Sequence, residues 1–457
     1  MGTGLDQEEL KELDSKELQE LLESVAKRDP DQPEFLQAVT EVAASLQPVF
    51  KKRPELLPVF RRLCEPERQV MFRVAWLDDN NEIQINRGFR VQFSSAIGPY
   101  KGGLRFHPSV NLSIMKFLGF EQVFKNSLTT LAIGGGKGGS DFDPKGKSDG
   151  EIMRFCQSFM TELARHIGSS TDIPAGDIGV GSKEIGYLFG QFKRLTKEFV
   201  PVLTGKGLEW GGSFVRPEAT GFGAVFFAEE VLKDKGESLE GKRCLVSGAG
   251  NVAQYCAELL VERGAKVLTL SDSKGFIFKK EGLTKEDVSE VMKIKGSHNG
   301  SLKDLSDGAI EYCEGKSHPW GLDVEVDMVF PCATQNEVGE EDAKELVKKG
   351  CKYVVEGANM PCTPEAAKLF ASEGVTYCPG KAANAGGVAV SGLEIIQNRL
   401  GEAWEKDEVQ ERLQNIMQSI FQACKQAAEE YKVDLAAGAN IAGFLKVAEA
   451  MLAQGAV

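Results

Sequence analysis

The chain lacks the cysteine and histidine spacings of common metal sites. Its ten cysteines are scattered without a C-x-x-C pair, and its four histidines form no H-E-x-x-H motif. These absences argue against a zinc ribbon, a thioredoxin-like redox motif and a zinc hydrolase, so we expect no metal. Scattered cysteines in a large chain are typical of a reducing compartment, which predicts a cytoplasmic protein.

Long hydrophobic runs and an excess of positive charge are also missing. No apolar stretch comes near the ~18 residues that a membrane-spanning helix needs, and the acidic segment 5–29 lacks the apolar core of a signal peptide. Lysine and arginine total 54 against 67 aspartate and glutamate residues, a net charge of −13. Because nucleic acids and anionic membranes attract basic proteins, we expect neither as a partner.

Three lysines stand in glycine-rich or apolar settings, where lysine is uncommon. Lys101 lies in PYKGGLRFHP, Lys125 in FEQVFKNSL and Lys137 in IGGGKGGSDFDP. Glycine lets a ligand approach the backbone closely, so the pattern predicts ammonium groups aimed at a small anion. Ammonium groups that converge disfavour one another's charge, and at least one could therefore act as a base near neutral pH.

The N-terminal half shows helical and extended patterns joined by glycine-rich segments. Helices are expected over 6–63 (with breaks), 109–127, 147–167 and 182–198, and strands over 68–76 and 83–93. The glycine-rich segments around Lys101 and Lys137 are predicted to be loops. TDIPAGDIGVG, residues 171–181, is predicted to be neither helix nor strand.

From about residue 213 short apolar runs alternate with helical patterns. Strands are expected over 243–247, 266–270, 326–330 and 353–355, and helices over 219–234, 251–264, 284–294, 340–349 and 363–371. This alternation predicts a doubly wound α/β domain with a parallel sheet. Helical pattern returns from about 386 to the end.

The first of these strands leads into a G-x-G-x-x-A motif within LVSGAGNVA, residues 245–253. Gly248 would permit the tight turn, and Gly250 would let a pyrophosphate approach the backbone. Asn251 and Val252 would begin the helix whose N-terminus faces the phosphates. A strand before the motif and a helix after it are the required context, so the motif predicts a dinucleotide site.

The end of the second strand carries conflicting signals about the dinucleotide. Asp272 stands where an acidic residue usually holds the ribose 2′-hydroxyl of NAD. Ser273 and Lys274 instead suit the 2′-phosphate of NADP, as would Lys295 if its loop folds back. We expect NADP, with NAD as the alternative.

The chain resembles the hexameric glutamate dehydrogenases of the small-subunit, NADP-linked type. Besides the motifs above, the resemblance rests on RGFRVQFSSAIGPYKGGLRFHPSVN, RPEATGFG, PCATQNE, EGANMP and GKAANAGGVAVSGLE, and it extends from about residue 33. It implies an α/β substrate-binding and oligomerisation domain over 1–212, with a C-terminal helix at about 430–457 packing back onto it. A Rossmann-like dinucleotide-binding domain would span 213–429.

The resemblance implies an activity and the residues that bind its substrate. The protein would be a homohexamer that converts L-glutamate reversibly to 2-oxoglutarate and ammonium, with hydride transfer to NADP. Lys101 and Ser391 would bind the side-chain carboxylate of glutamate. Gln122 and Lys125 would bind its α-carboxylate.

The resemblance also implies catalytic and cofactor roles. Lys137 would deprotonate the attacking water, and Asp177 would move protons to and from the amino nitrogen. Thr220, Asn251 and Asn359 would contact the cofactor. Asp172, close to Asp177 in sequence, is expected to be structural.

Alternatives stay open at this point. Many NADP-linked relatives have arginine where this chain has His298. A neutral imidazole offers a 2′-phosphate no positive charge and fewer hydrogen-bond donors than a guanidinium does. A dehydrogenase for neutral amino acids would carry apolar residues at 101 and 391, because a buried unpaired ammonium is costly. A nucleotide-sensing protein without activity would lack Lys137 or Asp177.

Overall fold

The computed structural model describes residues 13, 15–296, 300–305, 308–315 and 317–456. The chain folds into two compact units. Unit 1 comprises Met1–Arg216, Val390–Val409 and Asn440–Val457, and unit 2 comprises Pro217–Ala389 and Gln410–Ala439. The first boundary lies close to the predicted 212/213. Residues 390–409, however, group with unit 1 and not with the region predicted to bind dinucleotide, so the chain crosses between units more often than expected.

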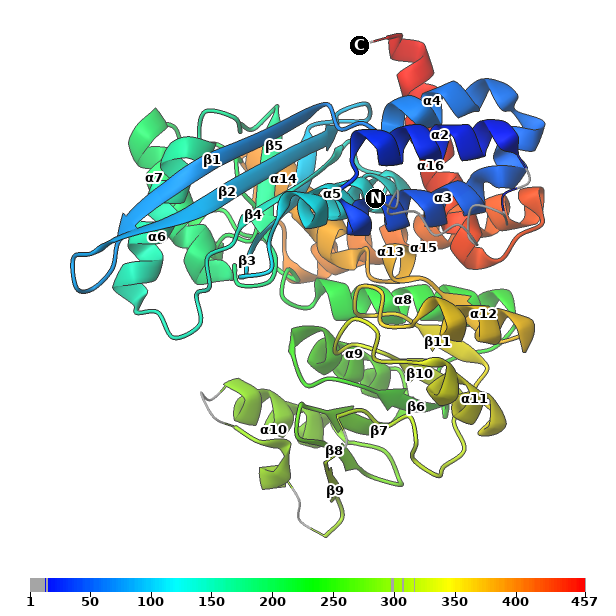
Figure 1. The fold of residues 1–457 in the computed structure, drawn as a ribbon. Coiled ribbons are helices and arrows are strands. Elements are labelled where there is room, and N and C mark those ends of the chain that lie inside the picture. The colour runs from blue at the N-terminus through cyan, green and yellow to red at the C-terminus, as the bar shows by residue number, and fades with distance from the viewer. Residues whose placement is uncertain (1–12, 14, 297–299, 306–307, 316, 457) are drawn as a thin grey trace. The chain divides into compact units, whose positions relative to one another are not determined.

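Unit 1 is built on a five-stranded sheet in the order β1-β2-β4-β3-β5 (Figure 1). The strands are β1 (Arg68–Leu77), β2 (Ile83–Ser94), β3 (Tyr100–Phe106), β4 (Gly135–Ser140) and β5 (Asp172–Gly176). β2 is antiparallel to both β1 and β4, whereas β3 runs parallel to both β4 and β5. The helices are α2 (Lys16–Arg28), α3 (Pro33–Lys52), α4 (Leu57–Leu63), α5 (Leu112–Leu128), α6 (Asp149–Leu163), α7 (Ser182–Thr196) and most of α14 (Gly386–Leu400).

β3, β4 and β5 correct the prediction that the glycine-rich segments are loops. A side chain at Gly102 would place its Cβ 1.7 Å from the carbonyl oxygen of Gly136, and one at Gly135 would come within 2.4 Å of Val123 on α5. Glycine is therefore required where β3, β4 and α5 pack closely, although its strand propensity is low. Pro174 is tolerated because β5 is an edge strand.

Helices cover both faces of this sheet. Leu104 and Phe106 of β3 belong to a core formed with Phe155 and Phe159 of α6 and with residues of α7. Because strand residues alternate between faces, the odd-numbered residues of β3 lie on the opposite face. α5 packs closely on the sheet, since a Cβ at Gly119 would contact Phe93 of β2 and one at Gly102 of β3 would contact Gln122 of α5.

Unit 2 contains a seven-stranded sheet in the order β12-β11-β10-β6-β7-β8-β9. The strands are β6 (Arg243–Val246), β7 (Lys266–Ser271), β8 (Gly275–Phe278), β9 (Glu311–Glu314), β10 (Met328–Phe330), β11 (Tyr353–Val355) and β12 (Thr376–Cys378). β12, β11, β10, β6 and β7 are parallel, which confirms the predicted parallel sheet, whereas β8 and β9 add antiparallel pairs. The short strands β8, β9 and β12 were absent from the prediction.

The helices of unit 2 alternate with these strands, as predicted for a doubly wound fold. They are α8 (Ala219–Asp234), α9 (Asn251–Glu262), α10 (Lys285–Gly296), α11 (Glu340–Lys348), α12 (Pro364–Ser372), α13 (Gly380–Ala383) and most of α15 (Lys406–Tyr431). β7 and β10 lie on opposite sides of β6, which makes the end of β6 a topological switch point. In open α/β sheets ligands bind at such a point.

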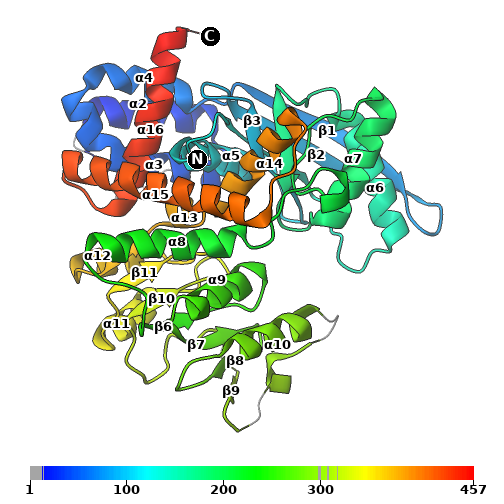
Figure 2. The same cartoon turned by 180° about the vertical axis from the view of Figure 1, so that it is seen from behind.

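α16 (Leu435–Gln454) is long and apolar enough to cross a membrane, judged by length and composition alone. Its packing explains this apolar character. Phe444 makes edge-on contacts with Phe50 and Phe60, and Lys446 donates a hydrogen bond to the carbonyl of Thr129. Figure 2 shows α16 in red beside α2 and α4. α16 therefore packs as a core helix of unit 1 over residues 440–454.

Candidate active site and dinucleotide cavity

Asp177, just after β5, is held between two cations. Lys137 of β4 donates from Nζ to Oδ1 at 2.9 Å, and Arg105 of β3 donates from Nε to Oδ2 at 2.7 Å. The three side chains are largely buried. A Cβ at Gly103 would lie 2.8 Å from the Cβ of Asp177, so this glycine leaves the space that Asp177 occupies. The sequence predicted Lys137 and Asp177 as site residues, but not Arg105.

The charge of Asp177 is decided by these partners. Burial raises the pKa of its carboxyl, but the charges of Lys137 and Arg105 and their hydrogen bonds outweigh this and hold the pKa below its usual range. Asp177 is therefore ionised at neutral pH. An ionised carboxylate in a water-poor site can accept a proton or stabilise a cationic amine.

Lys101 is the most deeply buried of the three predicted lysines, with 1% of its surface exposed. Its Nζ donates to Oγ1 of Thr204 at 2.8 Å. Burial lowers the pKa of Lys101 well below its usual value, and the charge of Arg216 lowers it further. The sequence did not point to Thr204 or Arg216; the TGKG segment that follows Leu203 was the available signal.

A buried carboxylate links this region to α14, which carries Ser391. Glu394 accepts hydrogen bonds from the backbone of Gly205 at 2.9 Å and from Nζ of Lys206 at 2.7 Å. These bonds fix the loop that begins at Thr204. Ser391 is buried and lies three residues before Glu394, so both occupy the same side of α14. The structure thus places Ser391 on the helix face that bonds to this loop.

Gln122 and Lys125 lie in the last two turns of α5. Gln122 donates its amide to Oδ1 of Asn126 at 2.7 Å. Asn126 in turn donates to the carbonyls of Lys101 at 3.0 Å and Gly134 at 2.5 Å. This buried asparagine was missed by the sequence analysis, although it follows Lys125 directly. It fixes the end of α5 against β3, and so brings Gln122 and Lys101 to the same region.

Asp172 is fully buried in a separate ion pair. Its carboxylate accepts hydrogen bonds from Nε of Arg90 and from Nε2 of Gln92, both at 2.9 Å, and a second bond from the guanidinium of Arg90. Both carboxylate oxygens are thus engaged by protein groups. This is the structural role that we expected for Asp172.

A cavity of about 700 Å³ lies in unit 2 at the predicted dinucleotide motif. Gly248 adopts φ +85, a conformation that favours glycine. A Cβ at Gly250 would meet no atom within 4 Å, so the backbone here faces open space. The lining also includes Asn251, Asp272, Ser273, Lys295, His318, Thr334 and Glu337. An exposed glycine turn at the start of α9 fits a dinucleotide pyrophosphate.

Asp272 and Lys295 form an ion pair at this cavity. Lys295 donates from Nζ to Oδ2 of Asp272 at 3.2 Å, and the backbone of Lys274 donates to Oδ1 at 3.0 Å. The side chain of Lys274 is exposed, whereas Ser273 and Lys295 line the cavity. Lys295 lies in the last turn of α10 and not in a loop. His298 lies outside the described residues.

Of the remaining predicted cofactor residues, Asn251 lines the cavity, whereas Thr220, Val252 and Asn359 do not. Asn251 donates to the carbonyl of Pro217 at 2.5 Å, which ties α9 to the segment before α8, and Val252 follows it on α9. Thr220 is the second residue of α8. Asn359 is exposed and accepts a hydrogen bond from Asn384 at 2.9 Å. The roles of these residues stay predictions.

Glu337 is a cavity residue that the sequence analysis missed. Its Oε1 accepts hydrogen bonds from the backbone of Ala333 at 2.9 Å and Thr334 at 3.2 Å. Burial raises the pKa of this carboxyl above its usual value. The PCATQNE segment that carries it was recognised only as a motif. Glu337 shapes the loop that lines one wall of the cavity.

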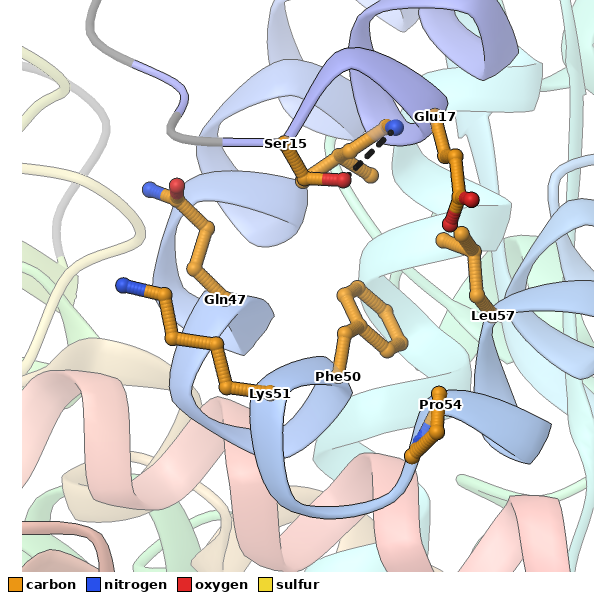
Figure 3. A pocket seen from close by; sticks show the side chains of 8 residues that line it. Ser15, Glu17, Gln47, Phe50, Lys51, Pro54 and Leu57 are labelled. Carbon is orange, nitrogen blue, oxygen red and sulfur yellow. Dashed lines mark hydrogen bonds between the residues drawn. The ribbon is translucent and has the colours of Figure 1, made fainter.

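A second, smaller cavity of about 200 Å³ lies between the N-terminal helices of unit 1 (Figure 3). Its lining includes Ser15, Phe50, Lys51 and Leu57. Ser15 accepts a hydrogen bond from the backbone of Leu18, which begins α2. None of the predicted site residues lines it, so the candidate site lies elsewhere.

Comparisons with known proteins agree on one family. The family model of the Glutamate/Leucine/Phenylalanine/Valine dehydrogenases matches residues 211–455, and that of their dimerisation domain matches residues 66–194. The chain is 65% identical to the NADP-specific glutamate dehydrogenase of Chlorella sorokiniana, over 96% of this chain and 84% of the relative. It is 53% identical to the NAD(P)-specific glutamate dehydrogenase of Xylanibacter ruminicola, over 95% and 99%.

A solved structure extends the agreement to the fold. The crystal structure of Plasmodium falciparum glutamate dehydrogenase superposes with a TM-score of 0.95 at 55% identity, covering 97% of this chain and 95% of that one. High identity over nearly the full length of both relatives shows common descent as well as a common fold. The chain therefore belongs to the Glu/Leu/Phe/Val dehydrogenase family, among the small-subunit, NADP-linked glutamate dehydrogenases.

Proposed function

We propose that this protein catalyses the reversible oxidative deamination of L-glutamate to 2-oxoglutarate and ammonium, with NADP as the cofactor. The observation that carries the proposal is the ionised carboxylate of Asp177 between Lys137 and Arg105, in the same unit as the buried Lys101. A cation for an anionic substrate and a carboxylate for its amine are the two groups that an amino dicarboxylate needs.

Lys101 and Ser391 bind the side-chain carboxylate of the substrate in this proposal. A buried ammonium is costly unless it gains an anionic partner, and a lowered pKa expresses that cost. A substrate carboxylate supplies the partner, whereas a neutral side chain does not. Gln122 and Lys125 bind the α-carboxylate, and the spacing of the two groups selects a five-carbon chain.

Lys137 and Asp177 carry the proton transfers. NADP, when bound, supplies the hydride acceptor for the substrate Cα. Lys137 deprotonates the water that attacks the oxidised carbon, and Asp177 exchanges protons with the leaving amino nitrogen. Their ion pair keeps both groups oriented before the substrate binds.

The cavity in unit 2 holds the dinucleotide in this proposal. Gly248, Gly250, Asn251 and Val252 form the turn for the pyrophosphate. The acid that would repel a 2′-phosphate, Asp272, is already paired with Lys295. This pairing supports NADP over NAD, with Ser273 and Lys274 as further phosphate contacts and Thr220 and Asn359 near the nicotinamide end.

Initial rates of 2-oxoglutarate plus ammonium, with NADPH and with NADH side by side, test the proposal. We expect turnover with a strong preference for NADPH. A preference for NADH would keep the chemistry and assign the ribose to Asp272. No turnover with either cofactor would contradict the substrate assignment and favour a neutral amino acid.

We also propose a homohexamer located in the cytoplasm. β1 is an edge strand of the unit 1 sheet, and Met71, Ile83 and Ile85 of β1 and β2 are 65%, 71% and 64% exposed. An exposed apolar edge is typical of a surface that pairs with another chain. Ten free cysteines support a reducing compartment. Light scattering should give six chain masses; one or two would contradict the hexamer.

A further inference from the structure

Arg105 is a charged partner of Asp177 to which the proposed function assigns no role. It lies on β3 two residues after Gly103 and four after Lys101, on the same face of the strand. Its Nε bonds to Oδ2 of Asp177, while Lys137 bonds to Oδ1. Each carboxylate oxygen thus has its own cation, from a different strand.

The two cations differ in what they can do during the reaction. A lysine that deprotonates water alternates between charged and neutral forms. A guanidinium stays protonated throughout, and its planar donors fix an orientation as well as a charge. When Lys137 is neutral, Arg105 is therefore the partner that keeps Asp177 ionised.

We propose that Arg105 is a positioning residue, whose guanidinium holds Asp177 by Oδ2, so that Oδ1, the oxygen that Lys137 contacts, is the one that exchanges protons with the substrate. The proposal rests on the proposed function of Asp177 and deepens it. Without this permanent cation, Lys137 and Asp177 could neutralise each other by passing one proton between them. Arg105 thus keeps Asp177 ionised when Lys137 loses its proton, so that the two groups change protonation state independently.

Among the described residues, the charged groups that act on Asp177 are Lys137 from β4 and Arg105 from β3. Burial acts in the opposite direction and raises the pKa of the carboxyl. Removing Arg105 therefore raises the pKa of Asp177, by about 1–3 pH units for the loss of one adjacent arginine. A reaction that needs the carboxylate then loses rate at a higher pH.

The test measures kcat/KM against pH for the wild type, Arg105→Gln and Arg105→Lys. We expect Arg105→Gln to lower kcat by about 10²-fold, as for other losses of active-site positioning, and to move the acidic limb of the profile upward by about 1–3 pH units. Arg105→Lys keeps the charge without the planar fork, so it should restore the acidic limb but only part of kcat. If Arg105→Gln fails to fold, the Arg105→Lys profile tests the proposal by itself. Its acidic limb should match that of the wild type, because lysine keeps the positive charge, while kcat should still fall because the planar guanidinium is lost.

Two controls separate this role from a loss of stability. Arg154→Gln removes an arginine on α6 that pairs with Asp79 at 2.6 Å away from the site, and it should leave the profile unchanged. In an Asp177→Asn background, Arg105→Gln should add little further loss, because it acts through Asp177. A fully additive loss, or a fall in kcat/KM with an unmoved acidic limb, would overturn the proposal. An inactive wild type would instead contradict the proposed function.

Discussion

Glycine-rich segments form the candidate site of unit 1 and the cavity of unit 2, but they contribute in different ways. In unit 1 the glycines lie inside strands, where Gly102 and Gly103 leave room for backbone atoms and for Asp177. In unit 2 Gly248 and Gly250 form a turn that faces open space. The first arrangement encloses fixed charges, and the second leaves room for a ligand.

The two regions also differ in how exposed their positively charged side chains are. The charges of unit 1 are buried and paired, as in Asp177 with Lys137 and Arg105. In the pair at the unit 2 cavity only the cation is more exposed: the side chain of Lys295 is 25% exposed, against 17% for Arg105 and 7% for Lys137, whereas Asp272 is as buried as Asp177. Solvent screens exposed charges. We therefore expect substitutions in unit 1 to affect the chemistry, and those in unit 2 to affect cofactor choice.

The largest expected effect comes from Asp177→Asn. The variant keeps the size of the side chain but loses the charge that exchanges protons, so kcat should fall about 10²–10⁴-fold. The binding of NADPH, measured by its fluorescence, should hardly change. An active Asp177→Asn variant, or one that no longer binds NADPH, would contradict the assignment of the chemistry to unit 1 and of cofactor binding to unit 2.

Replacing one glycine in each unit with alanine tests whether the glycines of the two units have different roles. Gly102→Ala would press a Cβ against a backbone oxygen, so we expect a loss of about 1–3 kcal/mol in stability or more. Gly250→Ala has φ −84 and free space around it, so its melting temperature should match the wild type. The added methyl group occupies ligand space, and NADPH should bind more weakly. Calorimetry and NADPH titration of both variants check this; a destabilised Gly250→Ala would contradict the open turn.

Lys295→Ala should change cofactor preference. It removes a cation that we assign to the 2′-phosphate and leaves Asp272 without its ion pair. A charge-assisted hydrogen bond contributes about 1.5–3 kcal/mol, so KM for NADPH should rise about 10-fold or more while KM for NADH changes little. Lys293→Ala, on the same helix and paired with Glu290, is the matched control. Equal increases for both cofactors would refute the assignment.

The smallest effect concerns stability against pH, and its sign should differ between the units. Asp177 has a lowered pKa in the folded chain, so its charge stabilises the fold above about pH 4 and that contribution is lost as pH falls further. Burial raises the pKa of Glu356 in unit 2, so its contribution is greatest below about pH 4 and is lost as pH rises. Asp177→Asn should flatten the acidic side of a melting-temperature curve, and Glu356→Gln the neutral side. Parallel curves would contradict both assignments.

The fold was predictable from the sequence wherever periodicity was strong. The predicted helices at 182–198 and 219–234 correspond to α7 and α8 within two residues, because their apolar spacing and flanking residues agree. β3, β4 and β5 were not predictable, since glycine and proline have low strand propensity. Only contacts with Val123 and with the backbone of Gly136 explain why glycine is needed there.

The candidate site was predictable in part for a similar reason. Lys101, Lys137 and Asp177 stand in motifs that resemblance can identify. Thr204 and Arg105 act through contacts with residues about 70 to 100 positions away, and no local pattern encodes such pairs. The ion pair of Asp272 with Lys295 was not anticipated: Lys295 was predicted only as a phosphate contact in a loop that folds back, whereas it lies in the last turn of α10.

The most direct test of a division of labour between the units is calorimetric titration with two separate probes. Glutarate, a five-carbon dicarboxylate without the amine, probes unit 1, and adenosine 2′,5′-bisphosphate probes unit 2. We expect Lys101→Met to abolish glutarate binding and preserve the bisphosphate, and Lys295→Ala to do the reverse. Glutarate binding that survives in Lys101→Met, or that is lost in Lys295→Ala, would contradict the account.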